Sequence, residues 1–100
     1  MKYLKGNKVI VRTNHAGVFY AVLSDYDPQT RTARLRDCRR IYYWSGACTL
    51  SQLAEEGVKN PDECKFTIYV PLMQVMEVIE IIPCSDEAIK IIEGVKIWKK

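Results

Sequence analysis

The segment TARLRDCRRIYYW, from Thr32 to Trp44, is the longest strand-like run in the chain. In a regular strand, side chains point alternately to opposite faces. One face would then carry Arg34, Arg36, Cys38, Arg40, Tyr42 and Trp44, and the other would carry Ala33, Leu35, Asp37, Arg39, Ile41 and Tyr43. A bulge near Asp37 would exchange the faces beyond it, because a slip of one residue inverts every side chain. The segment therefore predicts a long strand with a mixed arginine and aromatic surface.

Two shorter strand-like runs precede this segment. Lys8–Thr13 and Val18–Ser24 are rich in β-branched and apolar residues, and Asn14–Gly17 between them is typical of a hairpin connection. Asp25–Thr30 is a cluster of turn-forming residues, with Pro28 at the second turn position. We therefore expect the Thr32–Trp44 strand to return antiparallel to the second strand.

The second half of the chain predicts two helices and two further strands. Thr49 and Ser85 are placed to cap the helices, and Gly57 and Gly94 are placed to end them. Strands are expected over Lys65–Val70 and, after Pro71, over Leu72–Ile82, while Val95–Trp98 either forms a terminal strand or docks on the domain. The order predicts a single α+β domain over residues 1–100, built as a small curved antiparallel β-sheet or partial barrel with two short helices.

Composition limits the partners of this domain. Of its 100 residues, 48% are hydrophobic and 27% charged, and the net charge of +3 permits an anionic ligand but is weak for a protein that coats nucleic acid. The four cysteines lie 10, 16 and 20 positions apart without a C-x-x-C pair, and His15 is the only histidine, so neither a metal site nor any cofactor is expected. Buried free thiols, no signal-like start and no membrane-spanning apolar run together predict a cytoplasmic protein without membrane contact.

Arginines and aromatic residues adjoin one another at the end of the long strand. The guanidinium of Arg39 or Arg40 would suit a phosphate, and the ring of Tyr42, Tyr43 or Trp44 would suit a nucleobase. Core packing of the aromatics and a solvated arginine face are the alternatives. Three consecutive aromatics cannot all point inward from one strand, however, so at least one is expected on the opposite face or at an interface.

Polar groups near this segment complete a candidate ligand site. Ser45–Thr49 precedes a helix and could form an anion-binding nest, although plain turn and capping chemistry explains it as well. His15, Ser45, Thr49 and Ser51 would supply polar contacts to the ligand. No base, nucleophile and orienting group can be assembled from the sequence, and Cys48 has no partner for nucleophilic catalysis, so we expect a protein that is not an enzyme.

Three blocks of sequence carry a resemblance. The run Asp37–Leu53, the pair Arg12-Thr13 with His15–Val18, and the run Glu77–Cys84 resemble a family of small phage and prophage proteins of unknown function. This resemblance implies a phage accessory protein in the cytoplasm of the host cell. Some such proteins act as sponges that hold nucleotide immune signals without cleaving them, as oligomers with ligand pockets between subunits.

The leading hypothesis is therefore a non-enzymatic homo-oligomer that binds a nucleotide-type ligand, such as a cyclic nucleotide immune signal, as an anti-defence sponge. A shared pocket suits a chain of 100 residues, which has little room for a deep cleft of its own. Two alternatives remain open at this point. One is an accessory protein that binds single-stranded nucleic acid, which the modest charge disfavours, and the other is a protein-binding inhibitor of a host enzyme.

Overall fold

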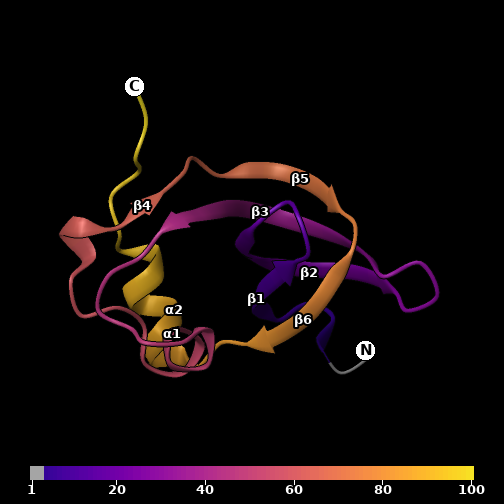
Figure 1. Cartoon of the computed structure of the whole chain (residues 1–100), viewed down its shortest axis with the longest axis horizontal. Helices are drawn as coiled ribbons and strands as arrows, with labels where there is room; N and C mark the ends of the chain where they lie inside the picture. The colour runs from indigo at the N-terminus through magenta and orange to yellow at the C-terminus, as the bar shows by residue number, and fades with distance from the viewer. Residues whose placement is uncertain (1–3) are drawn as a thin grey trace.

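The computed structural model describes residues 4–100 and contains one antiparallel sheet with two helices packed on one of its faces (Figure 1). Within these residues the sheet has six strands: β1 (Lys8–Thr13), β2 (Val18–Asp27), β3 (Thr32–Tyr43), β4 (Lys65–Phe66), β5 (Val70–Val75) and β6 (Val78–Pro83). The helices are α1 (Leu50–Glu56) and α2 (Asp86–Glu93), and a short 3-10 turn, η2, covers Pro61–Glu63. The predicted α+β class with a curved antiparallel sheet is confirmed, and the sheet does not close into a barrel.

Strand β3 organises the sheet. It pairs with β2 along one edge, and its other edge pairs with β5 over Ala33–Cys38 and with β4 near Ile41. The strands follow the order β4-β3-β2-β1-β6, and β5 lies beside β4 on the same edge of β3. A short turn at Met76-Glu77 joins β5 directly to β6 on the opposite edge, so the sheet must curl and one of its faces becomes concave (Figure 1).

The curled sheet has a separate apolar core on each face. The concave face buries Val11, Phe19, Leu35 and Cys38 together with Val75 at the end of β5. The other face of the sheet packs against the two helices. This second core contains residues of the strands and of the helices, namely Ile10, Tyr20, Ile41, Leu53, Ala54, Phe66, Ala88 and Ile92. Consecutive strand residues therefore serve different cores, as the period of two requires.

A bulge at Asp37 decides which arginine faces which core. Tyr20 pairs with Arg39 while Val22 pairs with Arg36, so two residues of β3 lie opposite one residue of β2. Asp37 has φ +48°, a left-handed conformation that such an extra residue commonly adopts. Beyond the bulge the faces are exchanged, as expected for a slip there, so Arg39 turns toward the helices.

Several boundaries differ from the sequence predictions. Strand β2 continues to Asp27, past the expected end at Ser24. The expected strand Lys65–Val70 is interrupted after Phe66, because Thr67 leaves the ladder pattern and its hydroxyl accepts a hydrogen bond from the Arg40 amide. The expected strand Leu72–Ile82 is two strands, because Glu77 adopts φ +58° in the turn between them.

Local signals at the helix ends are confirmed, whereas one expectation for the cysteines is wrong. The hydroxyls of Thr49 and Ser85 accept the capping hydrogen bonds of α1 and α2. Cys38 and Cys64 are buried as expected, but Cys84 is only half-buried and Cys48 is exposed. Cys48 lies in the turn before α1, where its amide donates to the Gln52 side chain and its thiol is left facing solvent.

A polar network ties the end of α2 to the sheet. Glu93 accepts hydrogen bonds from Lys8 at 2.5 Å and from the hydroxyl of Tyr20 at 2.6 Å. Burial opposes ionisation of Glu93, but these bonds outweigh burial and hold the pKa of its carboxyl below the ordinary 4.5. The pKa of the Tyr20 hydroxyl shifts in the opposite direction, because burial and the bond to Glu93 both raise it.

Glu93→Gln is expected to weaken the acid sensitivity of the fold. A carboxyl with a lowered pKa stabilises the folded state above its ordinary pKa, and this contribution is lost as the pH falls through its folded-state value. Urea unfolding of both proteins at pH 7, 5 and 3 (values spanning about two units either side of 5) measures the difference. Between about pH 7 and pH 3 the unaltered chain should lose more unfolding free energy than Glu93→Gln. Glu87→Gln, an exposed change in the same helix, should lose as much as the unaltered chain. Parallel curves for Glu93→Gln and the unaltered chain would exclude this role.

Candidate functional site

The two adjacent arginines of β3 have opposite environments. Arg39 is fully buried, although sequence reasoning places it in a ligand site. Its Nε donates to Thr67 O at 3.1 Å and its Nη2 to Phe66 O at 3.2 Å, while Nη1 donates to Ile92 O and Val95 O at 3.1 and 3.2 Å. The guanidinium thus holds the segment after β4 and the end of α2 together, and it is not accessible to a ligand.

Aromatic and dipole contacts stabilise this buried charge. The guanidinium carbon of Arg39 lies 4.7 Å from the ring centroid of Tyr69 and 5.3 Å from that of Phe66. Ile92 O is one of the last carbonyls of α2, where the helix dipole favours a cation. Carbonyls, rings and the helix end together replace the water that the charge loses on burial.

Arg40 faces the concave side and lines a hollow there. Its guanidinium carbon lies 4.9 Å from the ring centroid of Phe19. Within the described residues its guanidinium has no hydrogen bond or ion pair. The hollow measures about 420 Å³ and is enclosed by the β1–β2 hairpin and the end of β5, with the lining residues His15, Ala16, Phe19, Arg40, Met73, Gln74, Val75, Met76 and Glu77.

His15 is the second predicted ligand residue in this hollow. Its Nδ1 lies 2.9 Å from a carboxylate oxygen of Glu77. Because an ionised carboxylate only accepts hydrogen bonds, Nδ1 carries the proton of this contact and Nε2 remains for another partner. The hollow, named here the concave pocket, therefore combines a cation, an imidazole edge and apolar walls.

An aromatic stack lies beside the concave pocket. Phe66 packs toward the helices, so the adjacent Lys65 points to the opposite side, the side of Arg40. The contacts of Lys65 with the Trp98 ring and of that ring with Tyr42 place Tyr42 on this side as well. The rings of Tyr42 and Trp98 are stacked, with centroids 5.1 Å apart and an interplanar angle of 11°. Lys65 Nζ lies 5.5 Å from the Trp98 ring centroid, and Tyr42 is still 63% exposed.

The remaining predicted ligand residues lie away from Arg40 and His15. The ring of Tyr43 is 51% exposed, and Trp44 packs toward the helices while its Nε1 donates to Ala47 O. The Ser45 hydroxyl accepts from Asn60, the Thr49 hydroxyl caps α1, and Ser51 is exposed on α1.

The Ser45–Thr49 loop leaves few backbone donors for an anion. The amide of Cys48 donates to the Gln52 side chain, and the amide of Gln52 donates to the Thr49 hydroxyl. A shallow hollow of about 380 Å³ lies against this loop, but two of the amides that a nest would offer are engaged by side chains. Turn and capping chemistry accounts for the loop.

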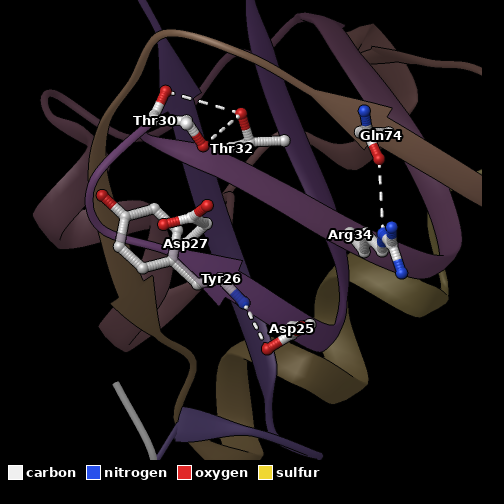
Figure 2. Close-up of a pocket in the computed structure, with 7 residues that line it drawn as sticks. All are labelled: Asp25, Tyr26, Asp27, Thr30, Thr32, Arg34 and Gln74. Carbon is white, nitrogen blue, oxygen red and sulfur yellow. Dashed lines mark hydrogen bonds between the residues drawn. The ribbon is translucent and has the colours of Figure 1, made fainter.

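A further hollow, near the β2–β3 turn, is built from groups that satisfy one another (Figure 2). Asp25 accepts from the Tyr26 amide and pairs with Lys5, the hydroxyls of Thr30 and Thr32 bond to each other, and Arg34 donates to Gln74. These contacts shape the turn. They engage the guanidinium of Arg34 and the threonine hydroxyls, which are therefore less available to a ligand than the guanidinium of Arg40.

Other chemistry is limited in the part of the chain that the structure describes. Burial raises the pKa of the Cys38 and Cys84 thiols to about 12 and also raises that of Cys64, which makes these thiols poor nucleophiles. Across residues 4–100 no three His, Cys, Asp or Glu side chains gather in a way that could hold a metal ion. No helix over the same residues is long and apolar enough to cross a membrane.

Sequence reasoning missed much of the concave pocket and its neighbour. Phe19, Met73 and Glu77 belong to ordinary strand and turn patterns, and only the curling of the sheet brings them to Arg40. Trp98 lies 56 positions from Tyr42 in the sequence, and its place depends on the bond from its amide to Phe66 O. A terminal segment that docks was one of the two expectations for Val95–Trp98, and the isolated bridge between Phe66 and Ile97 shows that it pairs with β4.

The fold and the concave pocket define a small α+β domain with a curled, open antiparallel sheet. The chain belongs to the family described as a domain of unknown function, DUF6948, which matches residues 6–92. No curated protein and no solved structure matches the chain. The predicted membership of a family of unknown function is thus confirmed, and the chemistry must be argued from the residues themselves.

Proposed function

We propose that this protein is a non-enzymatic binder of an anionic, nucleotide-type ligand, with the ligand phosphate held by Arg40 at the concave pocket. The observation that supports this most directly is the state of Arg40. Its guanidinium is fixed over the Phe19 ring, while its N–H donors have no acceptor among the described residues. A planar guanidinium with free donors suits bidentate binding of a phosphate.

The other walls of the pocket suit the rest of a nucleotide. Nε2 of His15 can accept a hydrogen bond from a ribose hydroxyl, because Glu77 orients the ring through Nδ1. Met73 and Met76 offer adaptable apolar surface to a sugar or base. Arg39 has no part in this proposal, because its donors are already engaged.

The biological setting belongs to the same proposal. The resemblance to phage and prophage proteins supports a role as an anti-defence sponge in the host cytoplasm, which holds a nucleotide signal and returns it intact. A second copy of the chain would cover the open side of the pocket, where Met76 exposes its side chain. Sedimentation with and without AMP tests the oligomer, and a monomer under both conditions would remove that part of the proposal.

Arg40→Ala is expected to weaken binding of AMP by about 10- to 150-fold, because hydrogen bonds to a charged group contribute about 1.5–3 kcal/mol. Isothermal titration calorimetry with AMP, with adenosine as the ligand that lacks phosphate, measures the effect. Arg36→Ala is the matched control, since Arg36 is an exposed arginine of the same strand and does not line the pocket. The free energy of unfolding of both variants should lie within about 1 kcal/mol of that of the unaltered chain.

Two results would reject this function. Equal affinity for AMP and adenosine would show that the phosphate is not recognised. Recovery of a hydrolysed nucleotide after incubation, measured by ion-exchange chromatography, would show an enzyme rather than a sponge.

A further inference from the structure

We propose that the ligand contains two nucleosides joined by a phosphodiester, with the phosphodiester at Arg40, one nucleoside in the concave pocket and the second base on Tyr42. This inference rests on the proposed function and names the class of its ligand. Arg40 is the residue common to both halves of the site, because it lines the pocket and lies two residues before Tyr42, on the side of β3 where Lys65, Trp98 and Tyr42 meet.

The spacing along β3 suits a nucleotide unit. Residues two apart in a strand are separated by about 6.6 Å, which places the Arg40 phosphate position next to the Tyr42 ring. A base that stacks on Tyr42 therefore needs only one sugar between itself and the phosphate. The other nucleoside extends from the same phosphate in the opposite direction, toward His15 and Met73.

The aromatic stack is built to receive a base on one side. Trp98 covers one face of the Tyr42 ring, and Lys65 lies near the Trp98 ring. Tyr42 is nevertheless 63% exposed, so its other face remains open to solvent. Stacked rings that end in a bare aromatic face, with Arg40 and Lys65 beside them, match the combination by which proteins bind unpaired nucleotides.

The edge of β5 beside this site is a poor place for a partner that would bind by adding a strand to the sheet. Augmentation of the sheet at β5 by a second strand is hindered by Pro71, which has no amide hydrogen to donate along that edge. The open Tyr42 face and the pocket are separated by only one residue of β3, a span that a ligand of two nucleosides can cover. A small phosphodiester ligand fits this arrangement.

The test compares three ligands of the adenine series by isothermal titration calorimetry with the full chain. The methyl ester of AMP carries one nucleoside and a singly charged phosphodiester, and the linear dinucleotide ApA adds the second nucleoside at the same charge. We expect ApA to bind about 5- to 150-fold more tightly than the methyl ester, the gain that one stacked base supplies. Cyclic di-AMP then distinguishes the sources, because tighter binding than ApA identifies a cyclic ligand and weaker binding a linear one.

Variants assign this gain to the stack. Tyr42→Leu should lower the affinity for ApA to that for the methyl ester and leave the methyl ester unaffected. Tyr43→Leu is the control, because Tyr43 is an exposed tyrosine next in sequence and has no ring partner among the described residues. Trp98→Leu should remove part of the gain, since it withdraws support from one face of Tyr42.

The outcomes separate this inference from the proposed function. If the methyl ester and ApA bind equally, or if Tyr43→Leu reduces the gain as much as Tyr42→Leu, the two-nucleoside ligand is wrong while phosphate binding at Arg40 stands. If neither binds the unaltered chain, the proposed function fails as well.

Discussion

Replacing Arg39 with methionine is expected to lower the free energy of unfolding by about 3–5 kcal/mol, the loss typical of removing one partner from a buried charged network. Methionine keeps most of the apolar stem but has no donor for the carbonyls of Phe66, Thr67, Ile92 and Val95. The carbonyls of Thr67 and Val95 would lose this donor in the interior, whereas those of Phe66 and Ile92 would keep the bonds from backbone amides. Domains of this size are stable by about 5–15 kcal/mol, so the variant should be close to unfolding at elevated temperature.

Urea unfolding measures this effect, and Arg36→Met provides the control. Arg36 is exposed and its side chain has no hydrogen bond or ion pair within the described residues, so its replacement should change stability by less than about 0.5 kcal/mol. Arg39→Lys should give an intermediate loss, because a single ammonium group cannot reach the four carbonyls that Nε, Nη1 and Nη2 of Arg39 contact. A loss under about 1 kcal/mol for Arg39→Met would contradict a structural role for Arg39.

The contrast between Arg39 and Arg40 shows how far the sequence could lead. Composition, turn residues and the period of two predict the antiparallel sheet, the two capped helices and a place for Arg39 and Arg40 on opposite faces. They could not predict which face is buried, because that depends on the bulge at Asp37. The possibility of a bulge could be read from the sequence, but its occurrence depends on packing against β2.

Long-range contacts explain what the sequence left out of the site. His15 and Arg40 could be named from residue type, but their common pocket requires β5 and the β5–β6 turn to fold over the concave face. Trp98 could not be paired with Tyr42, since the pairing depends on the bridge between Phe66 and Ile97. Ser45 and Thr49 were predicted to contact the ligand because they follow the aromatic residues in the sequence. In the structure their hydroxyls instead accept hydrogen bonds within the loop before α1 and at its cap.

That loop depends on one glycine, and Gly46→Ala is expected to destabilise the domain by about 2–5 kcal/mol. Gly46 has φ +94°, a conformation that costs a residue with a Cβ about 1–2 kcal/mol. A Cβ at Gly46 would also lie 2.7 Å from the amide nitrogen of Asn60 and closer still to that of Lys59. Both neighbours are backbone atoms, and the Lys59 amide already donates to Gly46 O, so the loop cannot yield without losing that bond.

Gly17→Ala separates the two costs. Gly17 also has a positive φ, +107°, but a Cβ there would meet nothing within 4 Å. Its replacement should therefore cost only the backbone term of about 1–2 kcal/mol. The difference between the two variants in urea unfolding measures the close approach of Gly46 to the Lys59-Asn60 backbone. Equal losses would mean that the loop relaxes freely around a methyl group, and the tight packing of the Ser45–Thr49 loop would then contribute nothing to stability.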